Sequence, residues 1–111
     1  MKTVYGTEMG DIVLSDYFAS LVNKVFKVLP IREREEATLV TYLDSLAIEL
    51  MGYESLLPDF SADGEFVSIL STVRYLRDNP GLPVSVVKRE VFRMIASCKK
   101  IEKRYGEVDR G

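Results

Sequence analysis

Apolar positions recur with the spacing of an amphipathic helix in four separate stretches of the chain. The clearest stretch follows an acidic run at residues 33–36 and ends at Gly52, a residue type that is common just after a helix. Its leucines stand at i, i+4, i+7 and i+11: Leu39, Leu43, Leu46 and Leu50. This period of about 3.6 residues predicts a helix whose leucine side faces a core.

The stretch before it carries a broader apolar face. We expect a helix over residues 15–29, with Ser15 as its N-cap and an end at Pro30, because proline disfavours a helical conformation in the residue before it. The apolar residues cover about half of the helix circumference: Tyr17, Phe18, Leu21, Val22, Val25, Phe26, Val28 and Leu29. A simple surface helix needs a narrower stripe than this.

Two more helices are predicted in the second half of the chain. Ser61 or Asp63 is expected to cap the first of them, which ends at the turn sequence of residues 78–81. Ser85 is expected to cap the last helix and Gly106 to end it. The apolar stripes are Phe66, Ile69, Leu70, Val73 and Leu76 in the first, and Val87, Val91, Met94, Ile95, Cys98, Ile101 and Tyr105 in the second.

Together these elements predict an all-α fold, a compact bundle of about four helices that are mostly antiparallel because their connections are short. The length of 111 residues fits one domain, residues 1–111. Residues 1–10 contain two glycines and are expected to form a loose N-terminal arm. Residues 53–64 contain proline and glycine, and their Leu57 and Phe60 predict a loop that packs on the bundle.

Several kinds of chemistry are excluded by composition. The chain has no histidine, which removes the commonest general base and every Ser-His or Cys-His pair. Its single cysteine, Cys98, is too little for a structural zinc site and falls on an apolar stripe. The glycine-rich loops that cradle phosphates are missing from the sequence, and the acidic run at 33–36 suits a first helical turn better than a metal site. We therefore expect no catalytic residues, no metal, no cofactor and no enzyme activity.

Charge is distributed unevenly along the chain. The net charge is −2, yet residues 84–111 hold 8 Lys/Arg against 4 Asp/Glu, while residues 1–83 hold 7 against 13. The predicted last helix carries a basic surface of seven cations and one aromatic side chain: Lys88, Arg89, Phe92, Arg93, Lys99, Lys100, Lys103 and Arg104. An aromatic ring framed by lysines can anchor a protein contact or stack on a nucleic-acid base.

Three interpretations of the basic surface stay open. It can be an ordinary solvated helix face, a site for an acidic protein or a nucleic acid, or a surface neutralised by acidic residues of the predicted leucine-rich helix. Those acidic residues include Glu35, Glu36, Asp44 and Glu49. The overall charge of −2 and the lack of a recognisable helix-turn-helix spacing make nucleic acid the weaker alternative.

A surplus of apolar side chains favours a protein partner. We expect five of them to face that partner: Phe18, Val22, Phe26, Ile48 and Tyr75. Surplus apolar faces on small bundles indicate self-association or docking. The predicted function is a non-enzymatic protein–protein interaction or regulatory module, a homodimer or a binder of another protein, with nucleic-acid binding through the basic surface as the alternative. Because no signal peptide or membrane-spanning run is present, we expect a cytoplasmic protein without membrane contacts.

Overall fold

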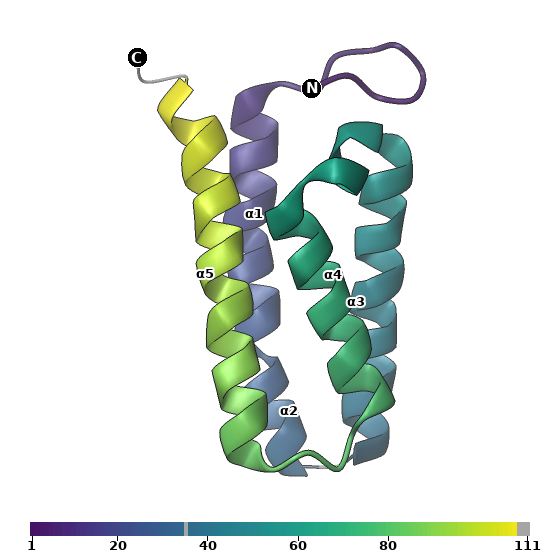
Figure 1. The fold of residues 1–111 in the computed structure, drawn as a ribbon, viewed down its shortest axis with the longest axis vertical. Coiled ribbons are helices and arrows are strands. Elements are labelled where there is room, and N and C mark those ends of the chain that lie inside the picture. Colours follow the sequence, from purple (N-terminus) through teal and green to yellow (C-terminus); the bar gives the residue numbers. More distant parts are fainter. Residues whose placement is uncertain (35, 109–111) are drawn as a thin grey trace.

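The chain forms an all-α bundle, which a computed structural model describes over residues 1–34 and 36–108 (Figure 1). Its elements are α1 (Asp11–Phe26), α2 (Val28–Arg34), α3 (Glu36–Leu56), the short 3₁₀ helix η1 (Pro58–Ala62), α4 (Gly64–Asp78) and α5 (Val84–Val108). The four long helices run alternately down and up, so that neighbours are antiparallel, as predicted. Within the described part of the chain, no helix combines the length and apolar character needed to cross a membrane.

Helices α1 and α2 follow one another with a break at Lys27, and Pro30 explains the position of that break. Proline lacks an N–H and its ring crowds the carbonyl four residues earlier. That carbonyl belongs to Phe26, the last residue of α1. The prediction that Pro30 ends the helix is wrong, because it lies in the first turn of α2, where a missing N–H leaves no intrahelical bond unmade.

Ser15 does not cap α1 as predicted, because its side chain contacts α5. Helix α1 begins earlier, at Asp11, and the Ser15 hydroxyl donates to the backbone oxygen of Glu102 in α5 (3.1 Å). Gly106 lies beside this bond, and a Cβ there would be 3.1 Å from the Ser15 Oγ. Gly106 therefore lets the two helices approach and does not end α5, which continues to Val108.

The end of α3 also differs from the prediction. The helix continues through Gly52, whose φ is not positive, to Leu56. In the added turn, Tyr53 stacks on Tyr17 of α1 with ring centroids 3.8 Å apart. A tertiary contact thus extends a helix that a glycine would otherwise have been expected to end.

The two predicted N-caps in the second half have different outcomes. Asp63 is confirmed as the N-cap of α4, because its Oδ1 accepts hydrogen bonds from the backbone N–H groups of Glu65 (3.0 Å) and Phe66 (3.1 Å). Ser85 does not cap α5. The helix begins at Val84, which places Ser85 inside the first turn.

The predicted apolar stripes of α3, α4 and α5 meet in one core. Phe18, Phe60 and Phe66 form its aromatic centre: the rings of Phe60 and Phe66 stack at 4.7 Å, and Phe18 contacts both rings edge-on. Phe60 and the fully buried Leu57 come from the connection between α3 and α4. That connection packs on the bundle, as predicted.

Residues 1–10, predicted as an N-terminal arm, fold back on themselves. Lys2 and Glu8 form an antiparallel β-bridge, and Gly6 takes a positive φ of 80° at the turn between them. The backbone N–H of Val4 donates to the backbone oxygen of Leu56 at 2.7 Å. The segment is thereby tied to the C-terminal end of α3.

Candidate functional site

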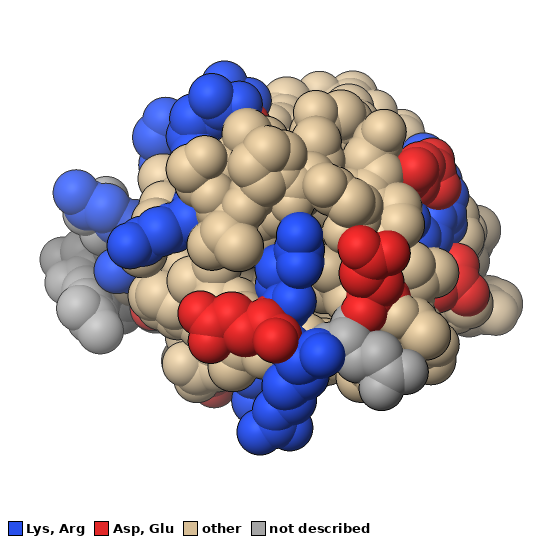
Figure 2. All heavy atoms as spheres, turned by 90° about the horizontal axis from the view of Figure 1, so that it is seen from below, with Lys and Arg blue, Asp and Glu red and all other residues tan. Residues whose placement is uncertain are grey.

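The basic surface forms the outward half of α5. Its core stripe packs against α1 and α4, so the cations on the other side of the helix reach solvent. At 1.5 Å per residue, the distance along the helix from Lys88 to Arg104 is about 24 Å. Figure 2 views the molecule from the end formed by α2 and the α4–α5 connection, and shows Lys and Arg gathered toward the side of α5.

Four cations of this surface form ion pairs with residues in the part of the chain that the structure describes. The pairs are Arg89–Glu90 and Arg93–Glu90 (both 3.3 Å), Lys100–Glu65 (3.6 Å) and Arg104–Asp63. Most of these cations remain about half exposed or more, and exposed ion pairs contribute under ~1 kcal/mol each. These four cations pair with only three carboxylates, so the pairs lower the positive charge of the surface without cancelling it.

The acidic residues of α3 are not the partners of these cations, contrary to one of the interpretations. Helix α5 packs against α1, α2 and α4, and it does not pack against α3. Glu49 instead binds Lys24 of α1 at 2.9 Å, and Asp44 pairs with Arg77 of α4 at 3.3 Å. Glu35 lies outside the described residues.

Phe92 lies at the centre of the unpaired part of the basic surface. Lys88 stands one turn before it and Lys99 two turns after it, and neither lysine forms an ion pair with a described residue. Phe92 is 46% exposed, and its ring contacts that of Phe26 in α1, which is 41% exposed, edge-on with centroids 6.0 Å apart. Phe26, one of the residues predicted to face a partner, therefore contacts Phe92 of the basic surface.

The five apolar residues predicted to face a partner do not form one surface. Phe18 and Val22 are buried, so this part of the prediction is wrong. Helix α1 packs along α5, and its broad apolar face is buried inside the molecule, where Phe18 contacts Phe60 and Phe66. Ile48 and Tyr75 are exposed, but they stand on α3 and α4, whereas Phe26 stands on α1.

A polar cluster that sequence reasoning missed joins α1 to α3. The Glu49 carboxylate accepts hydrogen bonds from the Tyr17 hydroxyl (2.7 Å) and from the Lys24 ammonium (2.9 Å), and the Tyr42 hydroxyl donates to the backbone oxygen of Lys24 (2.6 Å). Burial, and next the hydrogen bond to Glu49, raise the pKa of Tyr17 above its ordinary value. Its phenol therefore stays protonated near neutral pH and serves as a structural donor. The one signal for this cluster in the sequence is a set of tyrosines at the flanks of apolar stripes.

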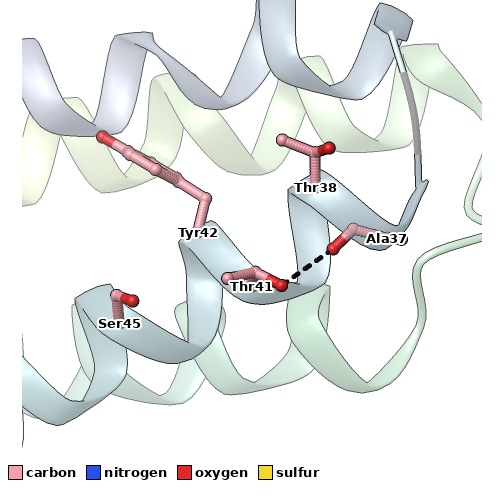
Figure 3. Close-up of a pocket in the computed structure, with 5 residues that line it drawn as sticks. All are labelled: Ala37, Thr38, Thr41, Tyr42 and Ser45. Atoms are coloured by element: carbon pink, nitrogen blue, oxygen red, sulfur yellow. Dashed lines mark hydrogen bonds between the residues drawn. The ribbon is translucent and has the colours of Figure 1, made fainter.

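A shallow depression on α3 offers no reactive group. It has a volume of about 450 Å³ and is lined by one side of α3: Ala37, Thr38, Thr41, Tyr42 and Ser45. Figure 3 shows Tyr42 reaching toward the neighbouring helix, while the Thr41 hydroxyl donates to the Ala37 backbone oxygen (3.1 Å). None of these side chains carries a charge at neutral pH.

The single thiol is also a structural group. Cys98 is fully buried in the core, and burial raises its pKa to about 12. The reactive form of cysteine is the thiolate, which is scarce at such a pKa. Among the described residues, no three His, Cys, Asp or Glu side chains are grouped so as to hold a metal ion.

No protein-family model matches the sequence, and neither a curated protein nor a solved structure is significantly similar to the chain. Function is therefore inferred from the residues of the surface itself.

Proposed function

We propose that the protein is a non-enzymatic interaction module that binds an acidic partner protein through the basic surface of α5. The observation that supports this most strongly is the half-exposed pair of Phe26 and Phe92 beside the unpaired Lys88 and Lys99. Aromatic anchors ringed by polar side chains carry much of the binding energy in protein interfaces. Lysines around them select a partner of opposite charge and speed its association.

The partner is a different molecule and not a second copy docked by the same face. A two-fold symmetric contact on α5 would set its seven cations against seven identical ones. If the protein forms a homodimer, the outer face of α3 is the better surface. That face carries Ile48, which is 59% exposed, among small and largely uncharged residues. Light scattering separates the two cases, because a dimer held by α3 would persist at high salt.

A designed acidic peptide can stand in for the natural partner in a binding test. The probe is a fluorescent helical peptide with glutamates on one side and Leu and Phe on the other, and its binding is followed by anisotropy. The double variant Phe26→Ala/Phe92→Ala should bind it at least about 10-fold more weakly, the loss typical of interface anchors. Ile48→Ala is the matched control and should bind as the natural protein does. Equal affinity of the double variant and the natural protein contradicts the proposal.

Nucleic-acid binding is the second candidate, because seven cations and an aromatic ring lie on one exposed helix face about 24 Å long. A single-stranded oligonucleotide of the same charge as the peptide tests it. Phosphate contacts would make the logarithm of the affinity fall steeply with the logarithm of the salt concentration, and Lys88→Gln/Lys99→Gln would flatten that slope. If the oligonucleotide binds more tightly than the peptide and with such a slope, the basic surface is a nucleic-acid site.

A further inference from the structure

A second depression lies between α4 and α5, beside the basic surface. Its volume is about 360 Å³, and it is lined by Ser68, Ser71, Thr72, Tyr75, Glu90 and Arg93. The four residues from α4 stand at i, i+3, i+4 and i+7, so they share one side of that helix. A row of hydroxyl groups on α4 therefore faces a carboxylate and a guanidinium on α5.

Three of these hydroxyls have no protein partner in the described part of the chain. The Thr72 hydroxyl donates to the backbone oxygen of Ser68 at 2.8 Å. The side-chain hydroxyls of Ser68, Ser71 and Tyr75 form no hydrogen bond with described residues. A hydroxyl can donate or accept, so these three groups are free to bind a polar ligand of either charge.

The charged residues select an anion. Both oxygens of the Glu90 carboxylate are already in use, Oε1 by Arg89 and Oε2 by Arg93, each at 3.3 Å. The side chain of Glu90 is only 9% exposed, whereas that of Arg93 is 65% exposed and donates one hydrogen bond to Glu90. Arg89, Glu90 and Arg93 together carry one net positive charge. A cation would be repelled by two guanidinium groups, whereas an oxyanion would find the remaining donors of Arg93.

We propose that this groove between α4 and α5 binds a small oxyanion of the phosphate class. Arg93 supplies the charge and the planar donor group, and the hydroxyls of Ser68, Ser71 and Tyr75 donate to the remaining oxygens. Glu90 is a positioning residue, because it holds the Arg93 guanidinium at the edge of the groove. The groove shares Arg93 with the basic surface, but its lining excludes Phe92, Lys88 and Lys99, the residues that carry the proposed partner-binding function.

An NMR titration of the whole chain tests the site. Sodium phosphate and glycerol phosphate are added in parallel, each against sodium chloride at the same ionic strength, and the amide signals of Ser71, Thr72 and Tyr75 are followed. The expected result is a saturable shift of these signals. Saturation by inorganic phosphate alone assigns the site to the free ion, and tighter binding of glycerol phosphate assigns it to the phosphate group of a larger molecule; either supports the proposal.

Two variants separate the site from general electrostatics. Arg93→Gln should weaken phosphate binding at least about 10-fold, whereas Arg89→Gln, which loses a contact to the same Glu90 but does not line the groove, should change it less than about threefold. The absence of a saturable shift overturns the proposal, as does an equal response of the two variants or a shift spread along the lysines of α5. Glu90→Gln tests the positioning role. It should weaken binding while circular dichroism shows an intact fold, and tighter binding would show that Glu90 only repels the anion.

Discussion

Asp63 joins the first turn of α4 to α5, and its replacement should destabilise the bundle through two separable contributions. Its Oδ1 accepts the backbone N–H groups of Glu65 and Phe66, which otherwise lack a partner at the start of a helix. Its Oδ2 pairs with the guanidinium of Arg104 in α5. Asp63→Ala removes both contributions. Asp63→Asn removes only the ion pair, since asparagine is also a good N-cap.

The size of each contribution follows from its surroundings. Loss of a side-chain N-cap costs about 1 kcal/mol. The ion pair is worth less than about 1 kcal/mol, because the Arg104 side chain is 45% exposed and solvent screens the charges. We therefore expect Asp63→Ala to lower the free energy of unfolding by about 1–2 kcal/mol, and Asp63→Asn and Arg104→Gln by less than about 1 kcal/mol each.

Urea unfolding followed by circular dichroism measures these differences. For a chain of this length, 1 kcal/mol corresponds to a shift in Tm of roughly 4 °C, so heating provides a second reading. Asp63→Asn and Arg104→Gln break the same ion pair. The double variant should therefore lose less unfolding free energy than the two single losses added together. If Asp63→Asn proves as destabilising as Asp63→Ala, the N-cap contribution is wrongly assigned.

Three further predictions concern the core and the α1–α3 contact. Burial and Glu49 raise the pKa of Tyr17 above the value near 10 of an unfolded tyrosine. The stability that this shift gives is full below pH 10 and is lost as the pH rises above it. Between pH 9 and 11, the free energy of unfolding measured in urea should therefore fall less steeply for Tyr17→Phe than for the natural protein. Equal dependence on pH in the two proteins contradicts this. Cys98, buried and with its pKa raised to about 12, should react with a thiol reagent only as fast as the protein unfolds, and a rapid reaction of the folded protein would show that the site opens locally. Phe18→Ala should lower the free energy of unfolding by about 3–5 kcal/mol, and Phe26→Ala by far less because its ring is half exposed; equal losses in urea unfolding would contradict the assignment of Phe18 to the core.

The apolar periodicity predicts the core well because local spacing alone decides which side of a helix is apolar. It fails where a distant contact overrides a local preference. Ser15 bonds to α5 instead of capping α1, and Tyr53 stacks on α1 beyond Gly52. Pro30 lies in the first turn of α2 and not at the end of a helix, because α1 already stops at Phe26, four residues before it.

The basic surface is predictable as a set of residues, but its pairing is not. Helical spacing places seven cations on one side of α5, whereas the ion pair of Arg104 depends on where α4 begins. The contact of Phe26 with Phe92 likewise depends on the antiparallel packing of α1 on α5. The breadth of the apolar face on α1 suggested a partner, yet burial of Phe18 and Val22 shows that most of it serves the fold.

Mapping the bound acidic peptide onto the protein tests the central claim most directly. In a nitrogen-15 NMR titration with the designed peptide, the largest shifts should fall on Phe92, Lys88 and Lys99 and on Phe26 across the helix contact. Added salt should weaken the binding without moving these shifts, because the apolar centre fixes the position. Shifts centred on Ile48 and the outer face of α3, or spread evenly along α5 with no response of Phe26, would contradict the proposed interaction surface.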